Sequence, residues 1–345
     1  MEPVNVHDYE ALAREAMHPA AWAYISAGSG EETTLEENRA AFERMKLLPR
    51  VLRGVGSVDL RTTILGTEVG TPILVAPMGV HGLAHSEGEC ATARAAGSAG
   101  SLMAVSTASS RSLEEISVSA TGPLWFQLYV YRSRPFAERR VRRAERAGYR
   151  AIVLTVDSPR WGRKERFLRV EQTLPSELDY SSLDEEGLSE EEFVPATLTW
   201  EDVTWLRSLT DPPVVLKGIL HPEDAALAVE HGAAGIVVSN HGGRQLDGVP
   251  ASIEALSGVV EAAGGRAEIY LDGGIRRGTD ALKALALGAR AVFVGRPVLW
   301  GLASGGEAGA RHILKLLSDE LESAMALAGQ PGVTEIDPDL VVWER

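Results

Sequence analysis

Residues 268–295 read EIYLDGGIRRGTDALKALALGARAVFVG and contain the unit from which the fold is predicted. A short apolar run, Glu268–Asp272, is followed by a helical-looking segment rich in alanine, and then by a second apolar run, Ala291–Gly295. Continuous apolar runs indicate strands that are buried on both faces, as in a parallel sheet covered by helices. The stretch therefore predicts a strand–helix–strand unit.

The same alternation extends back along the chain to Pro72. Six earlier runs, each followed by a helical-looking segment, bring the number of predicted strands to eight. Eight such units predict an α/β fold in which residues 71–345 form a (β/α)8 TIM barrel. A doubly wound open sheet is the alternative, but no G-x-G-x-x-G follows the first strand. The six runs are Ile73–Pro77, Leu102–Ser106, Trp125–Tyr129, Ala151–Asp157, Val214–Lys217 and Gly235–Asn240.

Two segments depart from this pattern. Residues 1–70 predict an N-terminal helical extension packed on the barrel, with a candidate capping box at Thr34-x-x-Glu37. Between Val170 and Trp200 the chain contains the acidic stretch SSLDEEGLSEEEF. A loop that leaves the carboxyl end of a barrel strand lies over the active face, so we expect residues 171–200 to form a mobile active-site loop. A solvated linker is the alternative.

Composition excludes several classes of function. The 345 residues carry 34 Lys and Arg against 48 Asp and Glu, and a formal charge of −14 disfavours nucleic acid and anionic membranes. The single cysteine, Cys90, and the absence of metal-ligand spacing among the histidines predict no metal site. We find neither a signal-peptide pattern nor an apolar stretch of the ~18 residues that would span a membrane. We therefore expect a cytoplasmic protein.

Polar side chains stand at the ends of most predicted strands. In a barrel the carboxyl ends of the strands surround one mouth, so these side chains are candidates for function. The loops DGGIRRG (272–278) and GRP (295–297) predict a phosphate site, because glycines expose backbone N–H groups and Arg276 and Arg296 add bidentate charge. The candidates at strand ends are Gln127, Tyr129, Thr155, Asp157, Lys217, Ser239, Asn240, His241 and Asp272.

The stretch SNHGGRQLD (239–247) predicts acid–base chemistry. His241 precedes two glycines, which leave the imidazole sterically free to face a ligand. Arg244 can bind a carboxylate while His241 handles a proton. Asp157 is a candidate carboxylate for orienting the imidazole and stabilising its protonated form.

With these motifs the chain resembles the FMN-dependent (S)-2-hydroxy-acid oxidase and dehydrogenase family, whose members include glycolate oxidase and lactate oxidase. The resemblance covers nearly the whole chain. It is most specific in SNHGGRQLD, LDGGIRRGTD and VGRP, with VVLKG, FQLYVY, LTVDSPR and AHSEGE in support. It implies FMN as cofactor, held by Pro77, Met78, Gly79, Ser106, Gln127, Thr155, Lys217, Ser239, Asp272, Gly273, Gly274, Arg276, Gly295 and Arg296.

The resemblance also implies a reaction and roles for residues. L-lactate or a similar aliphatic (S)-2-hydroxy acid would be oxidised to the 2-oxo acid, with O₂ reduced to H₂O₂. A dehydrogenase that passes electrons to a quinone or protein, and a non-catalytic barrel that binds FMN or a phosphorylated ligand, are the alternatives. The motifs leave open whether the α-hydrogen departs as hydride or as a proton. Relatives are commonly tetramers or octamers, so we expect a homo-oligomer.

The implied site places His241 as base, Asp157 behind it and Tyr129 near the substrate oxygen. Tyr24, Arg244 and the residue at position 164 would bind the substrate carboxylate.

Three positions depart from the family pattern. Lys164 stands where the family has an arginine, so a point charge replaces a bidentate fork, and Arg163 or Arg166 is a candidate to compensate for it. Ala108 stands where glycolate-oxidising members carry a tryptophan, which indicates more room beside the substrate. Met78-Gly79 replaces the usual Thr-Ala. The small residue near flavin N5 bears on oxygen access, and in some relatives a glycine there accompanies poor reactivity with oxygen, so the resemblance leaves oxidase and dehydrogenase open.

Overall fold

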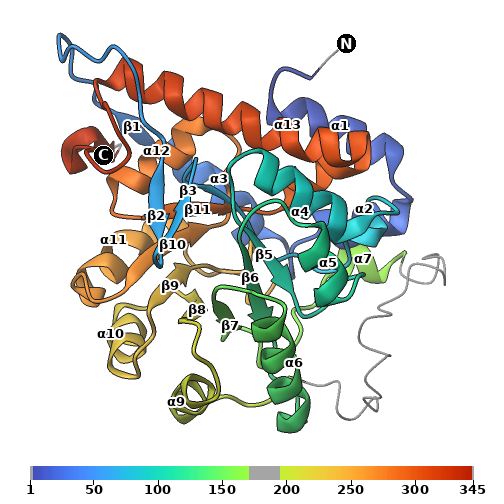
Figure 1. Cartoon of the computed structure of the whole chain (residues 1–345). Coiled ribbons are helices and arrows are strands. Elements are labelled where there is room, and N and C mark those ends of the chain that lie inside the picture. The colour runs from blue at the N-terminus through green and yellow to red at the C-terminus, as the bar shows by residue number, and fades with distance from the viewer. Residues whose placement is uncertain (1–2, 171–194, 344–345) are drawn as a thin grey trace.

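The computed structural model describes residues 3–170 and 195–343, and it confirms the predicted barrel. In this part of the chain, eight parallel strands close on themselves in the order β10-β11-β4-β5-β6-β7-β8-β9 (Figure 1). Each strand ends within two residues of its predicted end, as expected where pairing and apolar burial stop together. The strands are β4 (Ile73–Val75), β5 (Met103–Ser106), β6 (Leu124–Leu128), β7 (Ile152–Thr155), β8 (Val214–Ile219), β9 (Gly235–Val238), β10 (Glu268–Asp272) and β11 (Ala291–Val294).

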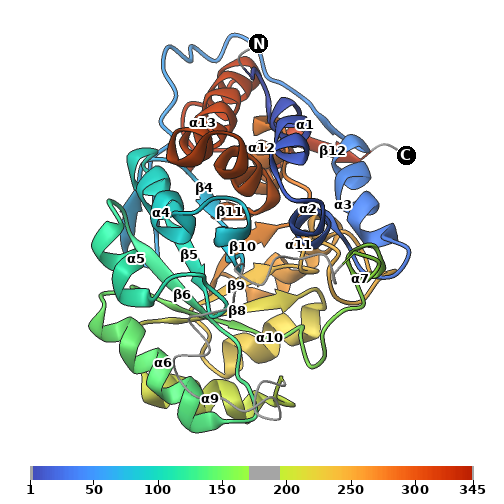
Figure 2. The ribbon, with the colours of Figure 1, turned by 90° about the vertical axis from the view of Figure 1, so that its right-hand side faces the viewer.

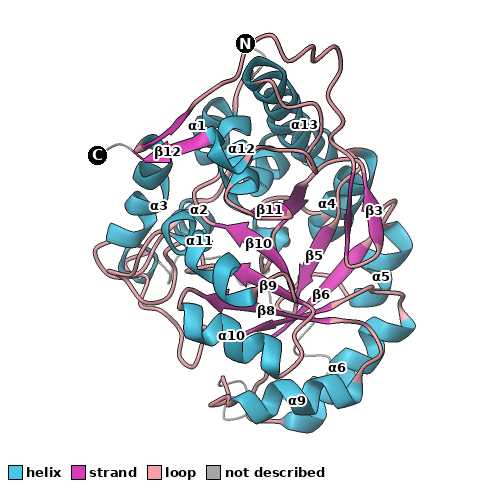
Figure 3. Cartoon of the chain, turned by 90° about the vertical axis from the view of Figure 1, so that its left-hand side faces the viewer, coloured by secondary structure: helices cyan, strands magenta, loops and turns pink. Residues whose placement is uncertain are grey.

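Helices surround the barrel on its outer side, as Figure 3 shows. Their apolar faces and the outward-facing strand residues form the largest buried cluster. None of the helices within the described ranges is both long and apolar enough to cross a membrane. The helices of the barrel are α4 (Gly88–Ser98), α5 (Leu113–Ser119), α6 (Arg134–Arg146), α7 (Glu165–Leu168), α9 (Trp200–Leu209), α10 (Pro222–Glu230), α11 (Ser252–Ala263), α12 (Gly278–Ala286) and α13 (Arg296–Ala328, kinked at Gly305 and Gly306), with 3-10 turns at His81–Leu83 and Pro338–Leu340.

Aromatic side chains fill the barrel interior. Trp125, Tyr270 and Phe293 pack together with ring centroids 5.4–5.9 Å apart. The hairpin of β2 (Thr62–Ile64) and β3 (Thr67–Val69) belongs to the same buried cluster, and Glu268, at the start of β10, accepts the backbone N–H of the hairpin turn. The amino end of the barrel is therefore packed, which leaves the carboxyl end for a cavity.

The segment before the barrel is only partly helical. It contains α1 (Val6–Ala16), α2 (Pro19–Ser26) and α3 (Thr33–Glu43), and then β1 (Met45–Leu47) and the hairpin. Helix α1 lies along α13, and β1 pairs antiparallel with β12 (Val341–Trp343), so the two chain ends meet on one side (Figure 2). The division into an extension and a barrel at residue 70 stays a prediction. Most of the predicted active-site loop, residues 171–194, lies outside the described residues.

The predicted capping box at Thr34 and Glu37 is wrong. Helix α3 has Glu32 as its N-cap, with no side-chain cap bond, and the Thr34 hydroxyl accepts the backbone N–H of Gly248 at 2.9 Å. The cap comes instead from Asp247, whose carboxylate accepts the backbone N–H of Thr34 at 2.8 Å. A distant residue of the loop after β9 thus caps the helix and binds the extension to the barrel mouth.

Candidate active site

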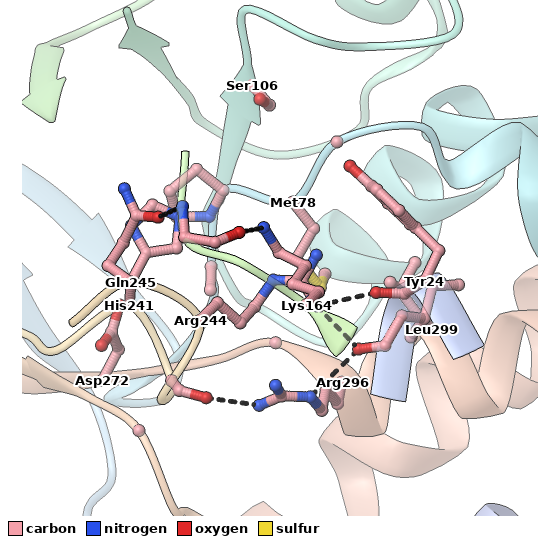
Figure 4. Close-up of a pocket in the computed structure, with 18 of the residues that line it drawn as sticks. Tyr24, Met78, Ser106, Lys164, His241, Arg244, Gln245, Asp272, Arg296 and Leu299 are labelled. Atoms are coloured by element: carbon pink, nitrogen blue, oxygen red, sulfur yellow. Dashed lines mark hydrogen bonds between the residues drawn. The ribbon is translucent and has the colours of Figure 1, made fainter. Parts of the chain in front are cut away.

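A cavity of about 630 Å³ opens at the carboxyl ends of the barrel strands. Its walls come from the loops after the strands, from α2 and from the segment between β7 and α7. Figure 4 shows Tyr24 entering from the side opposite His241 and Gln245. The cavity brings together most of the predicted site residues: Tyr24, Pro77, Met78, Gly79, Ser106, Tyr129, Lys164, Lys217, His241, Arg244, Asp272, Gly273, Gly274, Arg276, Gly295 and Arg296.

His241 sits between two polar partners. Its Nδ1 lies 3.0 Å from Asp157 Oδ1, and its Nε2 lies 3.3 Å from the Tyr129 hydroxyl. The backbone of His241 is left-handed (φ 60°), and its N–H donates to the Ser239 hydroxyl at 3.0 Å. A non-glycine residue adopts this conformation only where its surroundings hold it, so the loop fixes the direction of the imidazole.

Protonation states follow from this arrangement. Burial lowers the pKa of His241, and Asp157 only partly offsets that effect, so the imidazole is neutral at pH 7. For Asp157, burial opposes ionisation, but attraction to the protonated form of His241, the hydrogen bonds from His241 and Ser158 and the charge of Lys217 together outweigh burial and lower its pKa. Burial raises the pKa of Tyr129 well above 10, so its hydroxyl stays protonated. With Nδ1–H donating to the carboxylate, Nε2 presents a lone pair toward the cavity.

A buried polar layer lies beneath the cavity floor. Lys217 contacts Asp272 Oδ2 at 3.1 Å and donates to the Ser239 hydroxyl at 3.0 Å. Gln127 accepts from the Ser106 hydroxyl at 3.0 Å and donates to the Thr155 hydroxyl at 2.8 Å. Gln127, Thr155, Ser239 and Asp157 do not border the cavity themselves; they orient the side chains that do.

Four cations face the cavity without a carboxylate partner among the residues that the structure describes. Arg296 and Arg244 donate to backbone carbonyls of residues 24–27, and Lys164 donates to the carbonyl of Gly162 at 3.2 Å. Arg276 donates to the carbonyl of Ile275 and lies over the Trp300 ring at 4.8 Å. Burial lowers the pKa of Arg276 to about 10 and, with repulsion from Arg244 and Arg296, that of Lys164 to about 8. Desolvated positive charges without anions indicate a site for anionic ligands.

A model of the family described as FMN-dependent dehydrogenase matches residues 13–343. The chain belongs to this family. It is 50% identical to an L-lactate oxidase of Nostoc sp., with 97% of each chain covered, and 48% identical to a glycolate oxidase of Spinacia oleracea, with 97% of this chain and 95% of the relative covered. A solved structure of a mandelate oxidase with (S)-2-phenylpropionate matches with a TM-score of 0.92 at 46% identity, with 98% of each chain covered. The family resemblance is confirmed, and with it the FMN cofactor and the oxidoreductase class that the resemblance implied.

The cavity residues fit FMN, the cofactor of this family. Within the described ranges, Asp272 Oδ1 and Arg276 Nε are buried without a protein partner, which leaves an acceptor and a donor for a ligand. Gly273 and Gly274 have positive φ, and a Cβ on Gly274 would come within 2.0 Å of the Asn38 carbonyl, so no larger residue fits there. The guanidinium groups of Arg276 and Arg296 in the cavity wall suit a phosphate, and Lys217 suits a flavin ring that gains negative charge.

Sequence reasoning missed several side chains of the cavity wall. Trp161 lies edge-on to Tyr129 at 5.2 Å, and Phe167 lies edge-on to Tyr24 at the same distance. Gln245 accepts the backbone N–H of Gly162 at 2.8 Å and so joins the loop after β9 to the segment after β7. Gln245 belongs to the SNHGGRQLD motif, and the place of that motif after a predicted barrel strand could have identified Gln245 as a cavity residue. No local sequence pattern identifies Trp161 or Phe167 as residues of the cavity wall.

Proposed function

We propose that this enzyme oxidises L-lactate or a similar aliphatic (S)-2-hydroxy acid to the 2-oxo acid and passes the electrons to O₂, which forms H₂O₂. The observation that carries the proposal is the placement of a neutral His241, backed by Asp157, in the same cavity as the unpaired cations Arg244 and Lys164. Relatives named L-lactate oxidase and glycolate oxidase, near 50% identity, support this substrate class.

The cation pair and Tyr24 hold the substrate carboxylate. Arg244 and Lys164 line the cavity with the Tyr24 ring, and Arg244 lies 5.2 Å from the centroid of that ring. A carboxylate bound here would neutralise charges that otherwise stay desolvated, so binding removes part of their burial cost. An acid bound there would share the cavity with His241, which also lines its wall.

His241 and Tyr129 act on the substrate hydroxyl. The Tyr129 hydroxyl donates to the substrate oxygen, and His241 Nε2 takes the hydroxyl proton. The ionised Asp157, 3.0 Å from Nδ1, stabilises the imidazolium that results. When bound, FMN would supply the acceptor for the α-hydrogen and the electron pair of its C–H bond, which completes the two-electron oxidation to the 2-oxo acid.

The pocket beside the substrate leaves room for a side chain larger than hydrogen. Ala108, Tyr131, Trp161 and Leu168 contribute to its apolar wall. A branched or aromatic 2-hydroxy acid is the second candidate substrate, favoured by the small residue at position 108 and by the match to a mandelate oxidase structure. A quinone or protein acceptor is the second candidate acceptor, favoured by Gly79. The cytoplasmic location and the homo-tetrameric or octameric assembly stay predictions.

The flavin absorbance of the purified holoenzyme tests the proposal. Anaerobic addition of L-lactate should bleach the flavin bands, and readmitted oxygen should restore them with formation of H₂O₂. Bleaching by (S)-mandelate but not by L-lactate would replace the aliphatic substrate with an aromatic one. Bleaching without reoxidation by oxygen would replace O₂ with another acceptor, and no bleaching by any 2-hydroxy acid would refute the proposed oxidation.

A further inference from the structure

Arg166 of α7 joins the segment after β7 to the turn between α2 and α3. Its Nε and Nη2 donate to Glu32 Oε1 at 3.2 and 3.0 Å, and its Nη1 and Nη2 donate to the hydroxyl and carbonyl of Ser26 at 3.3 and 2.9 Å. Helices α2 and α7, far apart in the sequence, lie side by side (Figure 2). All three guanidinium nitrogens of Arg166 thus donate hydrogen bonds to the segment between Ser26 and Glu32.

Glu32 is held in a conformation that suits this contact. Its backbone is left-handed (φ 64°), an unfavourable conformation for a residue with a Cβ, and it does not cap α3 with its side chain. Its Oε1 accepts the backbone N–H of Gly28 at 2.7 Å as well as the two bonds from Arg166. The carboxylate therefore closes the turn and binds α7 at the same time.

The pair lies next to two of the groups assigned to the substrate carboxylate. Tyr24 precedes Ser26 by two residues, and Lys164 precedes Arg166 by two residues. Phe167, the next residue of α7, packs edge-on against the Tyr24 ring at 5.2 Å. Gly30 also donates its backbone N–H to the carbonyl of Arg163 at 3.1 Å. The contacts of Arg166 therefore contribute to the separation of Tyr24 and Lys164, beside the bonds of Arg244 and Arg296 to the carbonyls of residues 24–27.

We propose that Arg166 and Glu32 are positioning residues that fix the separation of Tyr24 and Lys164 for the substrate carboxylate. The inference rests on the proposed function, because it assumes that an anionic substrate binds between these two side chains. Arg166 itself does not border the cavity, whereas Lys164 does. The competing explanation is that Arg166 compensates for the lysine at position 164 by binding the carboxylate directly.

The two explanations predict opposite effects of Glu32→Gln. This substitution leaves the charge of Arg166 and removes a negative charge near the site, so electrostatics alone would improve anion binding. If Arg166 were a direct ligand, releasing it from Glu32 would likewise lower KM. If the pair positions Tyr24 and Lys164, loosening it should raise KM.

The experiment measures KM, kcat and the Kd of pyruvate, read from the flavin absorbance change, for the holoenzyme and four variants. Loss of charged hydrogen bonds that position a binding group should raise KM and the pyruvate Kd by about 5- to 20-fold in Arg166→Met and by about 3- to 10-fold in Glu32→Gln. The value of kcat at saturating substrate should stay within about twofold, because no group that reacts is removed. Arg166→Lys keeps one contact with Glu32 and should recover part of the loss.

Arg169→Met is the matched control. Arg169 follows α7 directly, its side chain is 72% exposed, and it pairs with Glu165 at 3.2 Å, so the variant loses the same charge without touching the turn. KM unchanged from this control in both Arg166→Met and Glu32→Gln would overturn the inference, and so would a lower KM in Glu32→Gln. A wild-type enzyme that no 2-hydroxy acid reduces would overturn the proposed function and this inference with it. Reduction of the wild type with unaffected variants would overturn the inference alone.

Discussion

Substrate capture should weaken as the pH rises through about 8, because Lys164 then loses its charge. Burial, together with the charges of Arg244 and Arg296, lowers the pKa of Lys164 to about 8. Below that pH the ammonium attracts the substrate carboxylate, and above it the neutral amine does not. The ratio kcat/KM reports groups of the free enzyme, so it should show a limb that falls on the alkaline side.

The size of this fall in kcat/KM follows from the contact between the Lys164 ammonium and the substrate carboxylate. A hydrogen bond between an ammonium and a carboxylate contributes roughly 1.5–3 kcal/mol, which corresponds to about 10- to 150-fold in kcat/KM. The ratio should therefore fall by up to about tenfold per pH unit above pH 8 and then level off. The plateau should equal the value for Lys164→Met, which lacks the charge at every pH.

Two substitutions separate Lys164 from other titrating groups. Lys164→Met should lower kcat/KM at about pH 7 by the full amount, about 10- to 150-fold, and its kcat/KM should no longer fall above about pH 8. Lys164→Arg should keep the charge to about pH 10 and restore a bidentate fork, so its profile should be flat and its KM lower. His241 cannot produce the limb, since burial moves its pKa below 6.5, and Tyr129 cannot, since its pKa lies well above 10.

The assay is the steady-state kcat/KM for L-lactate between about pH 6 and pH 10, with flavin content checked by absorbance at each pH. A limb near pH 8 that persists in Lys164→Met would refute the assignment of the charge to Lys164. Values within about twofold of wild type for both substitutions would show that Arg244 and Tyr24 hold the carboxylate without it.

Three further predictions concern the base, the phosphate and the acceptor. His241→Gln should keep FMN but slow flavin reduction by ~10²–10⁴, because the amide cannot take the hydroxyl proton; stopped-flow reduction within about threefold of wild type would exclude His241 as base. Arg296→Ala should weaken FMN retention more than it changes turnover of the flavin-replete enzyme. Equal Kd values for FMN in the variant and the wild type, measured by fluorescence titration, would show that Arg296 does not bind the phosphate. Gly79→Ala places a Cβ 3.2 Å from the Ala108 carbonyl and should alter reoxidation by O₂ while sparing reduction; stopped-flow reoxidation equal to wild type would exclude this position from acceptor choice.

The barrel, and which residues line its mouth, could be predicted because the sequence patterns that indicate them lie within short segments of the chain. A strand buried on both faces needs a continuous apolar run, and each run ends where the chain leaves the sheet. Parallel closure then brings every carboxyl end to one mouth, so residues as distant as Tyr129 and His241 fall into one site once the strands are counted. The roles of these residues stay predictions, to be tested as described.

The contacts that complete the site depend on docking between distant segments, which leaves no periodic trace in the sequence. Asp247 rather than Thr34 caps α3, because the loop after β9 reaches the helix only in the folded chain. For the same reason, the sequence could not show that Arg166 binds Glu32, 134 positions away, and does not line the cavity. The local sequence determined which residues stand at the strand ends. Only the tertiary structure decided which of these polar groups pair with one another, as Lys217 does with Asp272, and it alone set Arg244 and Arg296 against backbone carbonyls of the extension, which leaves their charges available for an anion.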